Sequence, residues 1–216
     1  MTKAKKGSSR RWLAQHEGDP YVLAARREGY RSRASYKLIE LDRRYGILRP
    51  GQRVVDLGAA PGGWSQVAAE RVGPQGQVWA CDLLAMAPIP GVWFQQGDFT
   101  EAEVLAALRD AIADAAVDVV ISDMAPNISG MRSVDQPRAM YLVELALEFA
   151  REFLKSGGVW VAKVFQGEGS DVLLREVRKA FRQVRVCKPE ASRAESREVY
   201  WVAEEFRGGS PGGMPL

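Results

Sequence analysis

The chain of 216 residues carries a formal net charge of +3 and is 46% hydrophobic and 26% charged, a composition typical of one globular domain with a single core. Two cysteines and one histidine argue against a disulfide framework, a zinc site and histidine-based catalysis, and we expect no metal. The sequence contains neither the ~18 successive apolar residues of a membrane span nor the apolar stretch of a signal peptide, which favours a cytoplasmic protein with no membrane partner.

Positive charge is concentrated in the first quarter of the chain. Residues 1–49 hold 13 Lys and Arg against 5 Asp and Glu, whereas residues 50–216 hold 17 against 22. A basic end can simply aid solubility, but it is also the electrostatic footprint that RNA phosphates require. Aromatic residues that could stack on bases lie among the charges, namely Trp12, Tyr21, Tyr30 and Tyr36. We predict a basic N-terminal arm over residues 1–29, mobile over about the first 20.

The first predicted elements of the core are a helix and the strand that follows it. Apolar residues recur at helical spacing over residues 35–48, and Pro50 ends that helix. A strand is expected over residues 53–57, directly before a glycine-rich turn and a second helix over 64–72. Turns of this kind, between a strand and a helix, are where α/β proteins bind nucleotides.

The turn reads Asp56-Leu57-Gly58-Ala59-Ala60-Pro61-Gly62-Gly63, which departs from the G-x-G-x-x-G pattern of dinucleotide folds. Pro61 removes a backbone donor that a pyrophosphate would use, and Asp56 places an acid beside the loop. An acid repels a phosphate but suits a cation. The pattern therefore predicts a ligand with a ribose and a positive charge but no phosphate. That description fits S-adenosylmethionine and argues against a dehydrogenase.

Two further acids stand at the ends of predicted strands. Residues 77–82 read as a strand that ends in Asp82, and the strand over 92–95 is followed by Asp98. A strand-terminal Asp is by itself more often a helix cap or a turn residue. Three in succession behind a glycine-rich turn favour a binding site instead. Asp82 is placed to accept hydrogen bonds from ribose hydroxyls, and Asp98 lies at the depth expected of the adenine.

Strands and helices alternate through the rest of the chain. Helices are expected over residues 101–114, 136–155 and 170–181, and strands over 117–122, 158–165, 183–188 and 198–204. The alternation predicts an α/β fold with a seven-stranded, mainly parallel sheet and helices on both faces. We expect one domain over residues 30–206, followed by a disordered Gly/Pro-rich tail over 207–216.

Two charged residues stand out on the later strands. Asp123 follows the apolar strand over 117–122, and ligands of open α/β sheets bind at such carboxyl ends. Lys163 interrupts the apolar run over residues 159–165, where a lysine is costly unless it is paired or neutral. A lysine that extends to the end of its strand would explain this position without a function. Taken alone, Lys163 therefore leaves both interpretations open.

Four segments resemble motifs of the FtsJ/RrmJ family of RNA ribose 2′-O-methyltransferases and occur in the same order, at residues 56–65, 123–127, 163–167 and 196–200. The resemblance covers residues 30–206 and is greatest to the bacterial enzymes that methylate a uridine in the A loop of 23S rRNA. It implies a Rossmann-like methyltransferase fold with the last strand antiparallel and S-adenosylmethionine as cofactor. It also implies a catalytic tetrad at Lys37, Asp123, Lys163 and Glu198. The residues expected to bind the cofactor are Asp56, Gly58, Pro61, Gly62, Gly63, Trp64, Asp82, Asp98 and Asp123.

The chemistry of methyl transfer explains such a tetrad. A ribose hydroxyl is a poor nucleophile, so a base must take its proton during the attack. Burial and a second ammonium group both favour the neutral amine that can do this. We assign Lys163 as the base, Lys37 as the second cation that also holds the hydroxyl, and Asp123 as the group that orients Lys163 and faces the sulfonium. Glu198 is expected to steer Lys37 or the ribose.

Two alternatives stand beside a 23S rRNA methyltransferase. The first has the same chemistry but acts on tRNA or on an mRNA cap, although no extra segment is present to build a cap-binding pocket. The second is a catalytically silent RNA-binding relative, which would be expected to lack a member of the tetrad, and none is missing here. The expected partner is 23S rRNA or the large ribosomal subunit, with the protein itself a monomer.

Overall fold

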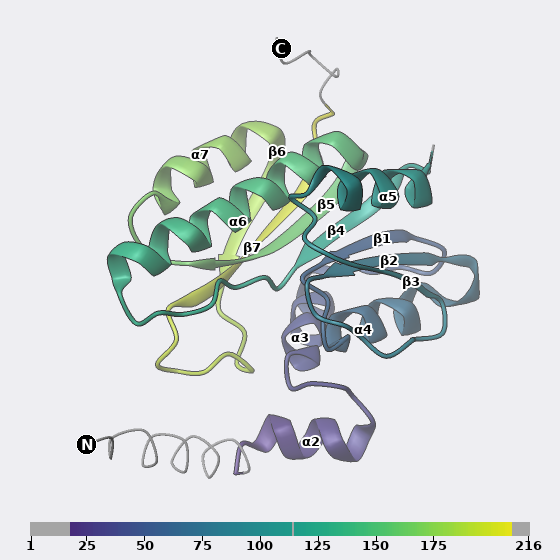
Figure 1. Ribbon diagram of the computed structural model, residues 1–216, viewed down its shortest axis with the longest axis horizontal. Helices are drawn as coiled ribbons and strands as arrows, with labels where there is room; N and C mark the ends of the chain where they lie inside the picture. Colours follow the sequence, from purple (N-terminus) through teal and green to yellow (C-terminus); the bar gives the residue numbers. More distant parts are fainter. Residues whose placement is uncertain (1–17, 114, 209–216) are drawn as a thin grey trace.

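Seven strands form one sheet in the order β3-β2-β1-β4-β5-β7-β6 in the structure, a computed structural model that describes residues 18–113 and 115–208 (Figure 1). The strands are β1 (Arg53–Leu57), β2 (Gln77–Asp82), β3 (Val92–Gln96), β4 (Val117–Ser122), β5 (Leu154–Phe165), β6 (Phe181–Cys187) and β7 (Glu198–Phe206). Neighbouring strands are parallel except around β7, which is antiparallel to both β5 and β6. The predicted fold, including its antiparallel last strand, is confirmed.

Helices cover both faces of the sheet (Figure 1). One face carries α3 (Ser35–Tyr45), α4 (Gly63–Val72) and the short 3-10 turn η1 (Gly73–Gln75), and the other carries α5 (Ala102–Ile112), α6 (Arg132–Phe153) and α7 (Ser170–Ala180). Successive side chains of a strand point to opposite faces of the sheet, so the same strands contribute to a hydrophobic core on each face. Val161 and Tyr200 pack toward α3 and α4, whereas Trp160 and Trp201 pack toward the other layer of helices. None of the helices in the described part of the chain is long and apolar enough to cross a membrane.

One further helix, α2 (Pro20–Glu28), lies outside the sheet and was not expected from the sequence. The Asp19 carboxylate caps its start, and Gly29 ends it in the left-handed conformation with φ of 78°. It is docked onto the domain, because Arg33 Nε lies 3.1 Å from Asp19 Oδ2 and the Tyr36 hydroxyl donates to Glu28 at 2.7 Å. The described end of the predicted basic arm is therefore a packed helix. The rest of that arm, residues 1–17, and the predicted tail from residue 209 onward lie outside the described residues.

Two boundaries differ from the prediction by four residues, and the other predicted ends agree within three. Helix α6 begins at residue 132 rather than 136 because Asp135 accepts bonds from the Ser129 and Gly130 backbone amides and so fixes the preceding loop against the helix start. Pro137 lies inside this helix, where its missing N–H removes one i→i−4 hydrogen bond. At the other end the backbone turns extended at Leu154, so β5 follows α6 without a loop.

Candidate active site

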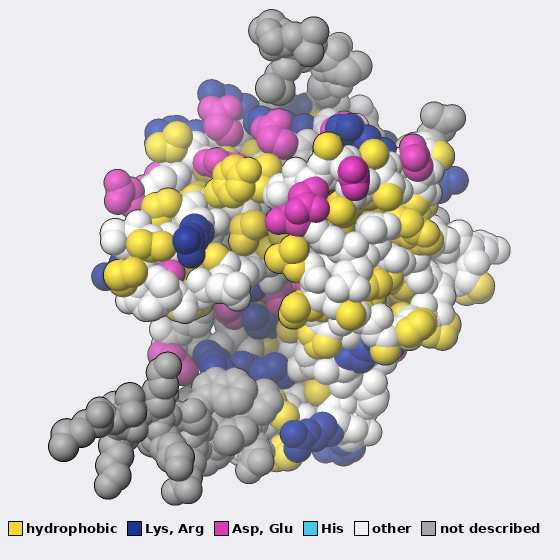
Figure 2. Space-filling view, in the orientation of Figure 1, with side chains coloured by type: hydrophobic (Ala, Val, Ile, Leu, Met, Phe, Trp, Pro, Cys, Tyr) yellow, Lys and Arg dark blue, Asp and Glu magenta, His cyan; other side chains and the backbone are white. Residues whose placement is uncertain are grey.

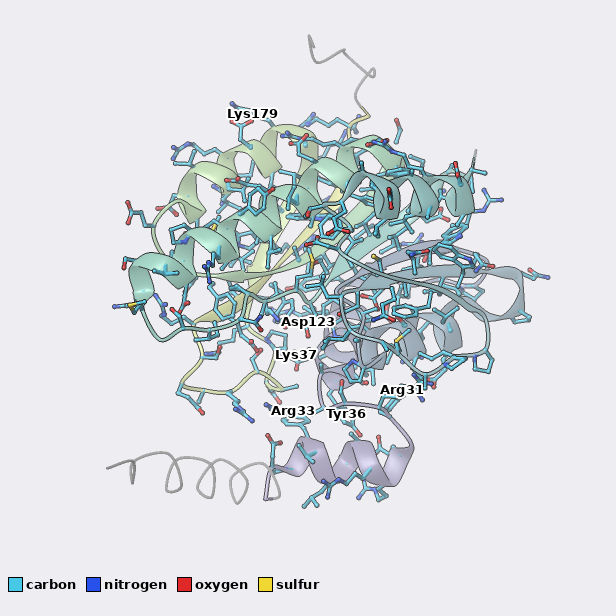
Figure 3. The ribbon with its side chains drawn as sticks, in the orientation of Figure 1. Arg31, Arg33, Tyr36, Lys37, Asp123 and Lys179 are labelled. Carbon is cyan, nitrogen blue, oxygen red and sulfur yellow. The ribbon has the colours of Figure 1, made fainter. Side chains whose placement is uncertain are left out.

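Four charged side chains converge where the central strands β4 and β5 end. Lys37 is in the first turn of α3, Asp123 directly follows β4, Lys163 is on β5, and Glu198 is the first residue of β7. Because β7 runs antiparallel to β5, its first residues lie at the carboxyl end of β5, with Glu198 opposite Phe165. Figure 3 shows Lys37 and Asp123 together in the middle of the molecule. The fold thus brings the predicted tetrad together from four separate parts of the sequence.

The tetrad is a compact cluster of two ammonium groups and two carboxylates. Lys37 Nζ lies 2.8 Å from Glu198 Oε1 and 3.9 Å from Asp123 Oδ1. Lys163 Nζ lies 3.1 Å from Asp123 Oδ1 and donates to the Asp123 backbone oxygen at 2.5 Å. Both lysines are buried, at 8% exposure each. Lys163 therefore does not extend into solvent, and the interpretation of it as a solvated strand-end lysine is wrong.

Tyr200 joins the cluster and was missed in the sequence. Its hydroxyl donates to Asp123 Oδ1 at 2.6 Å and accepts from Lys37 Nζ at 2.9 Å, so it connects the two halves of the tetrad. Burial, aided by the Asp123 charge, raises the pKa of Tyr200 well above its ordinary value, and the phenol stays neutral. Its position two residues after Glu198 on a predicted strand, hence on the same face, was the available signal.

Asp123 is held in its charged form. Burial by itself raises the pKa of this carboxyl, but the charges of Lys163 and Lys37 and the bond from Tyr200 outweigh it, so the pKa lies below its ordinary value. An ionised carboxylate at the centre of the cluster can orient both lysines. The orienting role expected of Asp123 stays a prediction.

The glycine-rich loop after β1 lies against the tetrad. Gly58 has φ of 79°, and a Cβ there would collide with Met124, the neighbour of Asp123. A Cβ on Gly63 would likewise collide with the Ser32 hydroxyl. These two positions need glycine because neighbouring segments pack directly onto the loop. The predicted cofactor loop and the predicted tetrad are thus in contact through the segment that follows β4.

Asp82 and Asp98 stand at the ends of neighbouring strands, as expected. Asp82 Oδ2 accepts from the Ala60 backbone amide at 2.9 Å and Oδ1 from that of Leu84 at 2.8 Å. Asp98 Oδ1 accepts from both the backbone amide and the hydroxyl of Thr100, at 2.9 and 2.7 Å. Since each carboxylate oxygen can accept two bonds, Asp82 can hold the glycine-rich loop and still receive ribose hydroxyls.

Asp56 lies under the loop rather than on its surface. The residue is 0% exposed, its Oδ2 accepts from the Ser65 hydroxyl at 2.6 Å, and its Oδ1 has no partner within the described residues. Burial, together with the charges of Asp123 and Asp82, raises the pKa of Asp56 to about 7 despite the Ser65 bond. The acid expected beside the loop is therefore closed off from solvent beneath it. A buried acceptor without a partner suits a hydrogen-bond donor.

Trp64 is part of the core and not of the loop surface. Its side chain is 2% exposed, its indole Nε1 donates to the Ala34 backbone oxygen at 2.8 Å, and its ring packs against that of Tyr200 with centroids 5.7 Å apart. The structure thus places the Trp64 side chain behind the tetrad, where it supports Tyr200.

Asp56 should make stability depend on pH. A folded-state pKa of about 7 lies above the ordinary value of 3.8, so the protonated carboxyl is favoured by folding and stability falls as pH rises from about 4 to about 7. The free energy of unfolding falls by about 4 kcal/mol over this range. Asp56→Asn, which resembles the neutral acid, should therefore lose less stability over this range than the wild type. Urea unfolding of both proteins without added cofactor measures the difference, and parallel pH profiles would contradict the expectation.

The molecule is hollowed between the main body and the segment that carries α2, and Figure 2 shows acidic and basic side chains at the bottom of this recess. A separate cavity of about 350 Å³ opens beside α4 and contains no member of the tetrad. It is lined by Arg31, Gln66, Ala69, Glu70, Ile89 and Pro90. No group of three or more metal-ligating side chains is found within residues 18–113 and 115–208. The cluster of Lys37, Asp123, Lys163 and Glu198, and not this cavity, is the candidate active site.

Comparisons with known proteins agree with this arrangement. The family described as FtsJ-like methyltransferase matches residues 30–206. A protein of Hahella chejuensis named Ribosomal RNA large subunit methyltransferase E is 62% identical over 93% of this chain and 98% of its own length. A protein of the same name from Pseudomonas aeruginosa is 56% identical over 95% and 99%, respectively. A crystal structure from Plasmodium falciparum, provisionally described as a ribosomal RNA methyltransferase, is 31% identical with a TM-score of 0.74 over 83% of this chain and 100% of that one.

Proposed function

The chain belongs to the FtsJ-like methyltransferase family, and from that premise we propose that it transfers the methyl group of S-adenosylmethionine to the ribose 2′-hydroxyl of a uridine in the A loop of 23S rRNA. It is an RNA methyltransferase that acts on RNA of the large ribosomal subunit, like the relatives it matches over nearly its whole length. The observation that carries the proposal is the buried cluster of Lys37, Asp123, Lys163 and Glu198 beside the glycine-rich loop. Its monomeric state and cytoplasmic location stay predictions.

The described residues fit this cofactor. Asp82 offers acceptors for ribose hydroxyls, and the unpartnered Asp56 Oδ1 offers a buried acceptor for a hydrogen-bond donor. Gly58, Pro61, Gly62 and Gly63 form the loop between these two acids, and Asp98 is the candidate for the adenine. When bound, S-adenosylmethionine supplies an activated methyl group on a positively charged sulfur.

The tetrad would handle the nucleophile. Lys163 Nζ, held by two contacts with Asp123, is assigned to take the proton of the 2′-hydroxyl. Lys37 is assigned to hold the hydroxyl oxygen, and its 2.8 Å contact with Glu198 supports a role for Glu198 in steering Lys37 rather than the ribose. Because the cluster is almost closed to solvent, water competes poorly for these groups.

Ribose-methylation mapping tests the proposed function. Total RNA from a strain that lacks this protein should lose one 2′-O-methyl group, at a uridine of the 23S rRNA A loop. The wild-type gene should restore it, and the Lys163→Ala gene should not. Loss of a methyl group in tRNA or at an mRNA cap would instead support the first alternative. Full methylation in the deleted strain would support the silent RNA-binding relative.

RNA binding should depend on the basic residues that precede α2. Because α2 is docked on the domain, the clean deletion removes residues 1–17, which include Lys3, Lys5, Lys6, Arg10 and Arg11, and keeps the helix. The deleted protein should bind S-adenosylmethionine as the wild type does but bind rRNA more weakly. The slope of log affinity against log salt should fall by about 0.7 for each lost phosphate contact. An unchanged affinity and slope, measured by filter binding, would reduce the segment to a solubility tail.

A further inference from the structure

The Arg31 side chain joins the segment between α2 and α3 to the loops around the proposed cofactor site by hydrogen bonds. Arg31 Nη1 donates to the backbone oxygens of Ala87 at 2.6 Å and Pro61 at 3.3 Å, and Nη2 donates to that of Pro88 at 2.7 Å. Figure 3 shows Arg31 between the α2 segment and the body of the molecule. A single guanidinium group thus bridges three separate stretches of the chain.

Two of these stretches are the loops that define the site. Pro61 belongs to the glycine-rich loop after β1, and Ala87 and Pro88 belong to the loop over residues 83–91 that connects β2 to β3. The loops are in close contact, since a Cβ on Gly62 would lie 2.7 Å from Met86 Sδ and 2.8 Å from Ile89 Cδ1. The same atom would lie 3.1 Å from Arg31 Cδ. Arg31 therefore lies directly where the two loops meet.

The backbone of this segment is also anchored, which fixes where the guanidinium stands. The Arg31 backbone amide donates to Gln66 Oε1 at 3.2 Å, and Gln66 Nε2 donates to the Gly29 backbone oxygen at 3.0 Å. Gln66 is on α4, the helix that begins at the glycine-rich loop. Arg31 is thus held by α4 and in turn holds the loop over residues 83–91.

That loop continues directly from the proposed ribose acceptor. Leu83 and Leu84 follow Asp82 and are 64% and 68% exposed, an apolar pair suited to the face of a flat base. The Leu84 amide bonds Asp82 itself. A displacement of the loop would therefore move both the apolar pair and the contact that orients the Asp82 carboxylate.

From these contacts we infer that Arg31 is a positioning residue of the cofactor site, which clamps the loop over residues 83–91 onto the glycine-rich loop, and is not a ligand of RNA phosphates. The inference rests on the proposed function, because it takes S-adenosylmethionine as the ligand of this site. Both terminal nitrogens of Arg31 are engaged by carbonyl oxygens. Arg26 on α2 is different, since it is exposed and makes no hydrogen bond or ion pair within the described residues.

Three variants separate a clamp from a phosphate ligand. Arg31→Ala removes the bridge, and Arg31→Lys keeps the charge but replaces the planar fork, which spans carbonyl groups of two loops, with a single ammonium. Arg26→Ala is the control that removes one positive charge nearby. Calorimetry with S-adenosylmethionine in the absence of RNA, and binding of an rRNA fragment over a series of salt concentrations, measure the two roles separately.

The clamp predicts that both Arg31 variants bind S-adenosylmethionine about tenfold more weakly, because part of the binding free energy must then order the two loops. In turnover assays the KM for S-adenosylmethionine should rise while kcat at saturating cofactor changes little, and the salt slope of RNA binding should match the wild type. Arg26→Ala should keep cofactor affinity, and its salt slope should fall by about 0.7 if Arg26 contacts a phosphate.

The opposite pattern overturns the inference. If Arg31→Ala binds S-adenosylmethionine as the wild type does and loses RNA affinity with a smaller salt slope, and if Arg31→Lys restores that affinity, then Arg31 is a phosphate ligand. Thermal unfolding without cofactor identifies a general folding defect. If Arg31→Ala does not fold, the same measurements on Arg31→Lys decide between the two roles. A wild type that fails to bind S-adenosylmethionine would contradict the proposed function itself, an outcome distinct from either result for Arg31.

Discussion

Lys163→Ala is expected to bind S-adenosylmethionine with unchanged affinity and to transfer its methyl group at least ~10²-fold more slowly, the usual contribution of a positioned base. The side chain lies within the tetrad, bound to Asp123, and takes no part in the loops assigned to the cofactor. Removing it should therefore leave cofactor binding intact and abolish proton removal from the ribose hydroxyl. Calorimetry and a single-turnover methylation assay on a 23S rRNA fragment give the two quantities.

The Lys163→Arg variant tests whether Lys163 accepts a proton or contributes only its positive charge. The arginine keeps a positive group beside Asp123 but cannot accept a proton near neutral pH, so it should be about as inactive as the alanine variant. An active arginine variant would reduce Lys163 to a positioning group. Thermal unfolding of both variants serves as the control, because the lysine is buried and its loss leaves Asp123 with Tyr200 and Lys37 as partners.

Asp82→Ala is expected to weaken S-adenosylmethionine binding tenfold or more. Its carboxylate is the proposed acceptor for the ribose hydroxyls, and a buried donor left without a partner costs roughly 1–3 kcal/mol. The same carboxylate also holds the backbone amides of Ala60 and Leu84, so the substitution loosens both loops of the site. Calorimetry measures the change in affinity.

A cofactor analogue separates the direct contact from the loosened loops. The deoxyribose form of S-adenosylhomocysteine lacks a hydroxyl that Asp82 would bind, so the wild type should bind it more weakly than the ribose form. Asp82→Ala should discriminate between the two forms much less, since it already lacks the carboxylate that would bind this hydroxyl. Equal discrimination by both proteins would show that the ribose lies elsewhere and that Asp82 only shapes the loops.

Much of this molecule could be predicted from local patterns. The apolar runs that end in Asp56, Asp82 and Asp123 and the glycine-rich turn specify strands, a turn and their order, because these depend on side-chain alternation and on neighbouring residues. The tetrad also came from the sequence, through a resemblance that assigns roles to positions. Helix α2 was not predicted, although Asp19 and Pro20 are typical of a helix start and Gly29 of a helix end. The basic composition of the segment had favoured an arm without a helix.

The strands of the sheet, the family motifs and the identity of the charged residues could thus be predicted, since each depends on residues close together in the chain. The partners of those residues could not be predicted, because they come from distant parts of the chain. Tyr200 meets Lys37 across 163 positions and Asp123 across 77, while Arg31 reaches Ala87 across 56. The tertiary structure also decided that Asp56 is buried and that Trp64 faces the core. Burial and hydrogen bonding between distant segments depend on how strands and helices pack, and no local pattern in the chain encodes that packing.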